Sequence, residues 1–271
     1  MSKVIKFLIF CGAIVAVVLF MTFRNHSSVD QNQMTYSVDD KALSTSIEKI
    51  MKDNPRINMS VSIFDLQTHR RYHYGETASF DVASVGKLVT ATTLLIRIEA
   101  NQLSLNDKLD GVPISELLRR MIVESDNDAW LKLNTRVLTH DELNYTAYQL
   151  GLTSYQSSSN TVTSDDIALL LAKIAQQKLF DSEHTDLLLS LMRQADMRNF
   201  IVKATPEGAE IYHKGGYLAD RVHDASIIHK GDRSYVLVIF SKARSGSYDY
   251  QKGSQIFAAI TDATADAFFT E

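Results

Sequence analysis

A serine and a lysine at close spacing are the first residues of the chain that could do chemistry. Ser84 and Lys87 are the two ends of the sequence Ser-Val-Gly-Lys. Residues three apart share one face of a helix, so an uncharged Lys87 amine could take the proton of the Ser84 hydroxyl and activate it as a nucleophile. Burial or a nearby cation would keep that amine uncharged, because both lower the pKa of a lysine. The pair therefore predicts acyl transfer by a serine, with lysine as its general base.

A second Ser-x-x-Lys sequence, at residues 46–49, lacks the surroundings of the first. Ser46 and Lys49 lie on an amphipathic segment, and we interpret both as solvated surface residues. Ser84 instead opens a helix after a strand and a loop. Free backbone N–H groups and the helix dipole favour negative charge at a helix N-terminus, where they would stabilise an alkoxide-like oxygen. Taken alone, Ser84 could still be a helix cap and Lys87 a surface residue.

Two further motifs follow in order, Ser-Asp-Asn at residues 125–127 and Lys-Gly-Gly at residues 214–216. Taken singly, they could be ordinary turn, cap and hairpin residues. Together with Ser-x-x-Lys they match the S-x-x-K, S-D-N and K-T-G set of class A β-lactamases and penicillin-binding proteins, except that Gly215 replaces Thr or Ser. On these residues the chain resembles the serine β-lactamase (class A-like) and penicillin-binding D,D-peptidase superfamily over roughly residues 40–270.

The resemblance implies a role for each polar residue of the second and third motifs. The Ser125 hydroxyl would pass a proton to the leaving nitrogen. Lys214 would manage protons and substrate charge, and it is the natural cation to lower the pKa of Lys87. The Asn127 side chain would contact both Lys87 and the substrate amide, whereas Asp126 would support the loop. Ser84, Lys87, Ser125 and Lys214 are thus the predicted catalytic residues.

Substrate binding is the second role that the resemblance assigns. The backbone N–H groups of Ser84 and Tyr217 would form an oxyanion hole, which can supply about 3 kcal/mol of transition-state stabilisation. The hydroxyl missing at Gly215 should weaken the grip on a substrate carboxylate, and Arg221 or His223 could compensate. The predicted substrate-binding residues are Asn127, Gly216, Tyr217 and Arg221.

The chain departs from class A β-lactamases in the step that releases the product. Those enzymes carry a loop glutamate between the second and third motifs that activates the hydrolytic water. The matching stretch here, residues 152–163, contains no carboxylate, and Asp165 and Asp166 look like first-turn helix residues. Asn160 could still position a water. We therefore expect fast acylation and slow deacylation.

The expected function is that of an active-site-serine hydrolase or acyltransferase that acts on β-lactam or D-Ala-peptide-type amides. One alternative is a true β-lactamase with an unusual water activator, and another is a catalytically inactive module that binds the cell wall. The expected partner is a small-molecule or peptidoglycan-peptide substrate. A net charge of −4 gives no basic excess for nucleic acid. No cofactor is implied, and neither the eight histidines nor the single cysteine shows a metal-site spacing.

The periodicity of apolar residues predicts the elements that must position these motifs. Helices are expected after Asp39 and behind Ser84, strands at 57–64, 70–74, 211–217, 223–230 and 234–241, and a last helix at 249–269. Thr163 and Asp166 suit a capping box at another helix start. This order predicts an α+β fold: an antiparallel sheet flanked by the terminal helices, with an inserted all-helical lobe at about 84–200. The active cleft would lie between sheet and lobe.

The N-terminal segment has the character of a membrane anchor. Lys3 and Lys6 precede an apolar run at residues 7–23, and seventeen helical residues span roughly 25 Å. A cleaved signal peptide would need small residues at the end of that run, but the run ends in Phe-Met-Thr-Phe at residues 20–23 and Arg24 follows. We expect a single-pass cell-membrane anchor at 1–24, a polar stalk at 25–38 and an extracytoplasmic serine hydrolase domain at 39–271. Soluble mature protein starting near Ser27 would instead identify a signal peptide.

Overall fold

The computed structural model describes residues 38–270. The predicted anchor at 1–24 and all of the stalk except Val38 lie outside the described residues. Within residues 38–270, no helix combines the length and apolar character needed to cross a bilayer.

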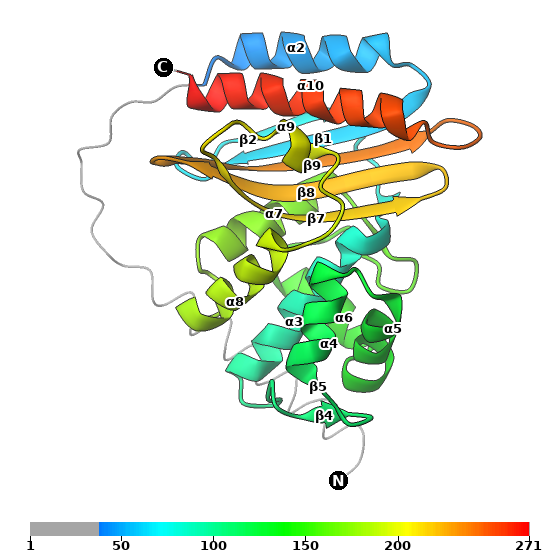
Figure 1. The fold of residues 1–271 in the computed structure, drawn as a ribbon, viewed down its shortest axis with the longest axis vertical. Coiled ribbons are helices and arrows are strands. Elements are labelled where there is room, and N and C mark those ends of the chain that lie inside the picture. The colour runs from blue at the N-terminus through cyan, green and yellow to red at the C-terminus, as the bar shows by residue number, and fades with distance from the viewer. Residues whose placement is uncertain (1–37, 271) are drawn as a thin grey trace.

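A five-stranded antiparallel sheet forms the centre of the molecule (Figure 1). Its order is β2-β1-β9-β8-β7, so strands from both ends of the domain pair directly through β1 and β9. The register joins Ile57 to Ala243 and Asp65 to Tyr235. The five predicted strands are confirmed. Their bounds are Ile57–Asp65 for β1, Arg71–Gly75 for β2, Glu210–Leu218 for β7, Arg221–Lys230 for β8 and Arg233–Ala243 for β9.

Two helices from the ends of the domain cover one face of the sheet (Figure 1). They are α2, Asp40–Asp53, and α10, Tyr250–Phe269. The carboxylate of Asp39 caps α2 by accepting hydrogen bonds from the Lys41 and Ala42 N–H groups. Leu43 and Ile47 of α2 join the apolar core between these helices and the sheet. The predicted terminal helices are therefore confirmed.

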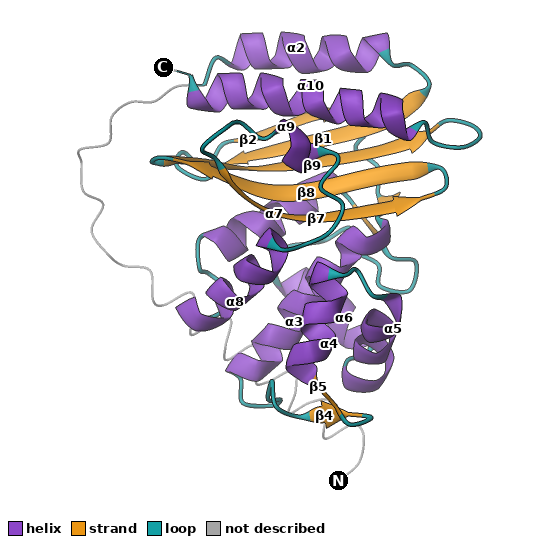
Figure 2. Cartoon of the chain, viewed as in Figure 1, coloured by secondary structure: helices purple, strands orange, loops and turns teal. Residues whose placement is uncertain are grey.

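A mostly helical lobe lies against the other face and holds the larger apolar core (Figure 2). Its central helix, α3, is buried from Lys87 to Ile96, as expected of a helix surrounded by other helices. Two short two-stranded sheets add to the predicted helices: β3, Phe80–Asp81, pairs with β6, Thr161–Val162, and β4, Lys108–Leu109, pairs with β5, Val112–Pro113. The helices are α3 Lys87–Glu99, α4 Ile114–Val123, α5 Asn127–Lys132, α6 His140–Gln149, α7 Ser164–Ala175, α8 Ser182–Arg193 and α9 Ile201–Ala204, with a 3₁₀ turn at Ala83–Gly86 and a π-helical turn at Leu133–Val137.

Candidate active site

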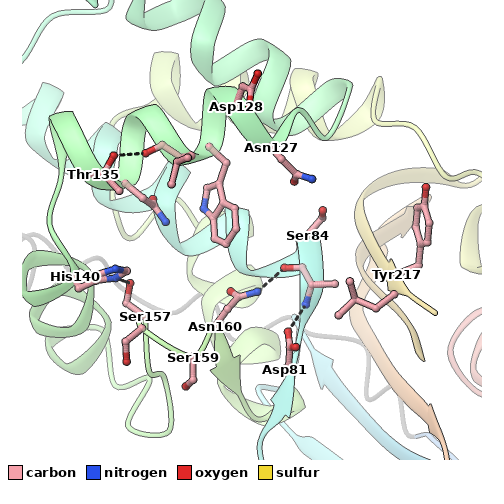
Figure 3. Close-up of a pocket in the computed structure, with 16 residues that line it drawn as sticks. Asp81, Ser84, Asn127, Asp128, Thr135, His140, Ser157, Ser159, Asn160 and Tyr217 are labelled. Atoms are coloured by element: carbon pink, nitrogen blue, oxygen red, sulfur yellow. Dashed lines mark hydrogen bonds between the residues drawn. The ribbon is translucent and has the colours of Figure 1, made fainter. Parts of the chain in front are cut away.

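Ser84 lies in the 3₁₀ turn that leads into α3, on a backbone held by its neighbours. Ala83 just before it has a positive φ of 48°, a conformation that costs free energy in a non-glycine residue. Two side chains hold it there: Asn160 Nδ2 donates to the Ala83 carbonyl at 2.8 Å, and Asp81 Oδ1 accepts from the Ala83 N–H at 3.2 Å (Figure 3). The turn thus presents Ser84 in a fixed orientation.

Lys87 lies one turn further along and points back toward the serine. Its Nζ is 3.1 Å from Ser84 Oγ, 2.7 Å from Asn127 Oδ1 and 2.6 Å from the Ser125 carbonyl oxygen. The lysine has 0% of its surface exposed, and burial lowers its pKa to about 8. An amine with this pKa is partly neutral near pH 7–8 and can accept a proton from Ser84.

Ser125 lies between the two lysines of the site. Lys214 Nζ donates to Ser125 Oγ at 2.9 Å, and Lys87 Nζ is 3.3 Å from the same oxygen. Burial, together with the positive charge of Lys87, lowers the pKa of Lys214 to about 7. From the sequence we expected Lys214 to lower the pKa of Lys87. In the structure burial lowers the pKa of Lys87, and the charge effect between the two lysines falls on Lys214.

Asp126 supports the loop, as the sequence analysis expected. Its carboxylate caps α5 by accepting from the Asp128 N–H at 2.8 Å and the Ala129 N–H at 3.1 Å. The same carboxylate accepts from Arg120 Nε at 2.8 Å. These bonds fix the start of α5, from which Asn127 reaches Lys87.

Strand β7 approaches the serine turn closely at Gly216. A Cβ at this position would lie 2.7 Å from the Ser84 nitrogen and 2.9 Å from the Val82 oxygen, so only glycine fits. β7 is an edge strand of the sheet. The close approach brings the backbone of Tyr217 beside that of Ser84, which is the arrangement needed for two N–H donors to meet one oxyanion.

A cleft of about 550 Å³ opens beside Ser84 (Figure 3). Ser84, Asn127 and Tyr217 line it together with Trp130 of α5. Trp130 Nε1 donates to Thr90 Oγ1 at 2.9 Å, and Lys87 Nζ lies 5.7 Å from the centre of its ring. His140 and the loop residues 157–160 also line it.

Arg221, a predicted substrate-binding residue, lies outside the lining of this cleft. Its Nε and Nη2 donate to the Asp220 carboxylate at 2.7 and 3.0 Å, and its Nη1 is 3.1 Å from Asp81 Oδ2. Two carboxylates therefore neutralise the guanidinium. This geometry counts against a direct role in binding a substrate carboxylate.

His223, the other suggested compensating residue, carries no charge. Complete burial lowers its pKa to about 3. Its Nδ1 accepts from the Ser241 N–H at 3.2 Å, so the proton is on Nε2, which donates to the Asp81 carbonyl at 3.0 Å. The histidine thus ties β8 to the strand that precedes Ser84.

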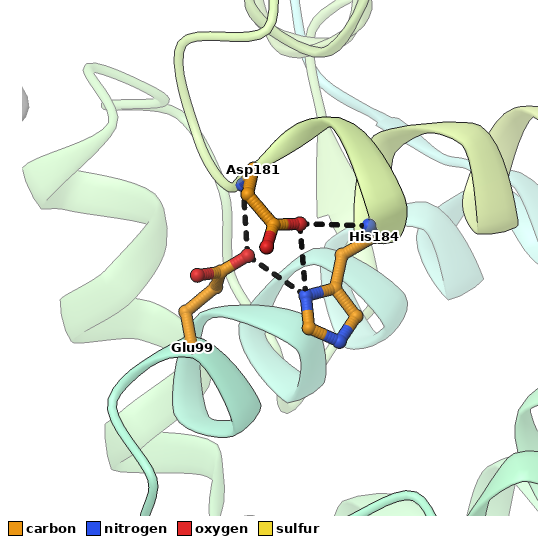
Figure 4. A group of neighbouring side chains, drawn as sticks. All are labelled: Glu99, Asp181 and His184. Carbon is orange, nitrogen blue, oxygen red and sulfur yellow. Dashed lines mark hydrogen bonds and ion pairs between the residues drawn. The ribbon is translucent and has the colours of Figure 1, made fainter.

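A cluster of Glu99, Asp181 and His184 lies away from the cleft, where α3 ends and α8 begins (Figure 4). His184 Nδ1 is 2.8 Å from Glu99 Oε1 and 3.2 Å from Asp181 Oδ1, and the Asp181 N–H also donates to Glu99 Oε1 at 2.8 Å. Hydrogen bonds among the three residues account for the cluster without a metal ion. The sequence does not indicate this cluster, because 82 residues separate Glu99 from Asp181.

Two residues beside the motifs have contacts that the sequence does not indicate. Asn160, for which we expected a role with water, donates to the Ala83 carbonyl. Met197 lies beside Gly215, where a Cβ would be 3.2 Å from three Met197 side-chain atoms. Neither contact leaves a periodic signal in the chain.

Comparison with known proteins links this geometry to one family. A family model described as "Beta-lactamase enzyme family" matches residues 42–268. No curated protein matches the chain. Among solved structures, "Structure of PBP-A" is 20% identical with a TM-score of 0.77, covering 86% of this chain and 97% of that one.

Two further solved structures have the same fold. A point mutant of PBP-A, described as an acyl-enzyme complex with penicillin G, is 21% identical with a TM-score of 0.76, over 84% of this chain and 96% of that one. A β-lactamase from Sphaerobacter thermophilus is 18% identical with a TM-score of 0.75, over 85% and 98%. At these identities the structural likeness shows the fold alone.

Proposed function

The chain belongs to the β-lactamase enzyme family, and we propose that it is an active-site-serine hydrolase or acyltransferase that forms an acyl-enzyme on Ser84. The observation that carries the proposal is a continuous polar chain from Ser84 Oγ through Lys87 Nζ and Ser125 Oγ to Lys214 Nζ. Each link is 3.3 Å or shorter. The proposed substrates are β-lactam or D-Ala-peptide-type amides.

Acylation follows from this chain of contacts. Ser84 Oγ attacks the amide carbonyl carbon and passes its proton to the neutral Lys87 amine, while the backbone N–H groups of Ser84 and Tyr217 stabilise the oxyanion. The C–N bond then breaks, and the leaving nitrogen takes the proton of the Ser125 hydroxyl. Ser125 regains a proton from whichever lysine is charged, because both Nζ atoms lie within 3.3 Å of its oxygen.

Residues 152–163 contain no carboxylate that could serve as the base for hydrolysis of the acyl-enzyme. Asp165 is bonded to Ser62 Oγ at 2.6 Å, and Asp166 to the Ser154 N–H at 2.7 Å, so both carboxylates are committed elsewhere. Asn160, which lines the cleft, is an amide and cannot take a proton from water. These contacts support slow deacylation as part of the proposal.

Two observations favour a true β-lactamase as the second candidate function. The Asn160 Oδ1 atom is buried and has no hydrogen-bond partner among the described residues, so it could hold a water. His140 lines the same cleft, with its Nδ1 2.7 Å from Ser157 Oγ, and a histidine can act as a base. The time course of an acyl-enzyme separates the two functions, since only a β-lactamase turns over rapidly.

The rate of acylation should depend on pH through the two lysines. Lys87 accepts a proton only when it is uncharged. Its pKa is about 8 and that of the adjacent Lys214 is about 7, so the site loses a proton between pH 6 and pH 9. Acylation should therefore rise with pH, and the second-order rate constant should be about ten- to fifty-fold lower at pH 6 than at pH 8. Stopped-flow measurement with a fluorescent penicillin tests this. A flat profile between pH 6 and 8 would mean that Lys87 is not the base.

A further inference from the structure

Both lysine amines of the site bond to uncharged oxygen atoms in the described part of the chain. Lys214 Nζ donates to Ser125 Oγ at 2.9 Å and to the Gly215 carbonyl at 3.2 Å. Lys87 Nζ likewise bonds to hydroxyl, carbonyl and amide oxygens. A buried amine without a carboxylate partner loses its proton more readily than an exposed one. The charge of the groups just outside these contacts therefore influences how readily Lys214 does so.

The buried carboxylate of Asp224 lies on the strand next to Lys214. Asp224 of β8 pairs with Gly215 of β7, and its side chain is 0% exposed. Residues directly opposite each other lie on the same face of a sheet, so Asp224 and Lys214 project from opposite faces. Burial and the charge of Lys87 lower the pKa of Lys214, whereas the charge of Asp224 raises it. An uncompensated Asp224 would therefore favour the charged form of Lys214.

His213 binds this carboxylate from the same face of the sheet. Its Nδ1 is 3.0 Å from Asp224 Oδ1, and both side chains are fully buried. Its Nε2 is 3.3 Å from the Ala195 carbonyl oxygen. An ionised carboxylate and a backbone carbonyl only accept hydrogen bonds, so each ring nitrogen must donate one. An imidazole that donates from both nitrogens is an imidazolium cation.

A second donor favours the charged form of the Asp224 carboxylate. The backbone N–H of Ile201, the first residue of α9, donates to its Oδ2 atom at 3.3 Å. Hydrogen bonds to a carboxylate stabilise its ionised form, and a buried charge needs a partner that is itself charged and hydrogen-bonded to it. His213 supplies that partner, and Ile201 supplies the extra hydrogen bond. The two side chains therefore form a buried ion pair without net charge.

The other charged groups around the ion pair are paired or exposed. Arg193 at the end of α8 and Glu210 of β7 pair with each other at 3.2 Å. His223, next to Asp224 on β8, is uncharged because burial lowers its pKa to about 3. The charged residues of the loop after α8, of α9 and of α10 are exposed, and they are Asp196, Arg198, Lys203, Lys252, Asp262 and Asp266. Solvent screens exposed charges, so the buried Lys214, the residue after His213, is the group on which the ion pair acts.

The same hydrogen bonds fix the loop beside β7. Ala195 opens this loop and Ile201 follows it, so the ion pair holds both of its ends. Met197, between them, lies against Gly215, where a Cβ would be 3.2 Å from its side chain. A change in either member of the pair would thus disturb the loop as well as the charge, and a test must separate the two effects.

We propose that His213 is a positioning residue that acts through the catalytic Lys214: as an imidazolium, it cancels the charge of the adjacent Asp224. The lysine then meets no net negative charge from its own sheet. It can give up its proton near neutral pH, as the proton transfers around Ser125 require. This inference rests on the proposed function, because Lys214 has a catalytic role only if Ser84 is acylated.

The charge of His213 is measured directly by NMR of the histidine ring nitrogens in the full chain. His213→Gln identifies the signals, because those of residue 213 disappear. We expect both ring nitrogens of His213 to carry protons at pH 7 in the wild type, and one of them to lose its proton in Asp224→Asn. A single protonated ring nitrogen in the wild type would overturn the ion pair, whether Asp224 is then ionised or protonated.

The titration of Lys214 is measured in the same variants by carbon NMR of labelled lysines, with Lys214→Arg to identify the signal. In the wild type the midpoint should lie at about pH 7. His213→Gln leaves the charge of Asp224 uncancelled, and an uncancelled negative charge favours the charged amine. The midpoint should therefore move up by about one pH unit. Asp224→Asn leaves no charge on either side chain, so the midpoint should stay at the wild-type value.

The double variant His213→Gln/Asp224→Asn is the matched control for packing. It removes the same histidine from the loop contact as His213→Gln but leaves no buried charge, so the Lys214 midpoint should return to the wild-type value. Thermal unfolding shows whether each variant is folded. A downward shift in Asp224→Asn would mean that the carboxylate is uncancelled in the wild type. No shift in any variant would mean that the pair does not act on Lys214, and either result overturns the proposal.

Adduct formation with penicillin separates this inference from the proposed function. The wild-type chain is incubated with a fluorescent penicillin and analysed by intact mass. No adduct, together with a doubly protonated His213, would overturn the serine mechanism and leave the ion pair in place. An adduct together with a neutral His213 would overturn the ion pair and leave the serine mechanism in place.

Discussion

Replacing Ser84 with alanine is expected to abolish covalent labelling by penicillin. The hydroxyl that forms the acyl bond is lost, and no other described serine hydroxyl lies within hydrogen-bonding distance of a lysine amine except Ser125, which accepts from both lysines. Removing the catalytic serine of a serine hydrolase typically lowers turnover by about 10⁶-fold. Intact mass after incubation with a fluorescent penicillin should therefore show the unmodified protein.

Ser46→Ala is the matched control, because Ser46 is the first residue of the other Ser-x-x-Lys sequence. It lies on the exposed side of α2, and Lys49 on the same helix pairs with Asp53 at 2.5 Å instead of with the serine. This variant should be labelled like the wild type. Thermal unfolding of both variants shows whether the fold is retained. A labelled Ser84→Ala protein with a native melting curve would assign the nucleophile to another residue.

The sequence predicted the parts of the fold that depend on local pattern. Alternating apolar residues such as Met59, Val61 and Ile63 mark β1, and all three are buried. The sequence also predicted a helix cap at Thr163, and in the structure Thr163 Oγ1 accepts a hydrogen bond from the Asp166 N–H at 3.3 Å at the start of α7. These features come from side-chain periodicity and from the needs of helix ends, which a single sequence records.

The sequence could not predict the features that depend on contacts between distant segments. The Asn160 side chain donates a hydrogen bond to the carbonyl of Ala83, 77 positions earlier in the chain. This bond stabilises the unfavourable φ of Ala83, which no sequence motif indicates. The Met197 side chain lies beside Gly215, and tertiary packing decides where the loop that carries Met197 runs. The order of the two lysine pKa values also needed the structure, because burial and the charge of the neighbouring lysine decide it and both lysines look alike in the sequence.

The acyl-enzyme formed with a β-lactam is expected to persist. Acylation uses Lys87, which is in place, whereas no carboxylate among residues 152–163 can activate the hydrolytic water. General-base assistance typically contributes about 10²–10⁴-fold, so its loss should slow deacylation by that factor and leave acylation fast. A mass-spectrometric time course should show one bound penicillin within seconds and its release over many minutes or hours. Several turnovers per second without an accumulating adduct would show that another group, such as His140, activates water.

Adding the missing carboxylate should shorten the life of that acyl-enzyme. Ser158 and Ser159 are exposed and line the cleft, so a glutamate there can reach toward the ester without displacing a buried contact. We expect Ser158→Glu or Ser159→Glu to accelerate deacylation by up to about 10²-fold, while the isosteric Gln variants at the same positions leave it slow. Glu and Gln have nearly the same shape, so a difference in deacylation rate between the two variants reports the effect of the basic carboxylate and not of a change in loop packing. If the Gln variants accelerated release equally, access of water to the ester, and not the lack of a base, would be what limits the wild-type enzyme.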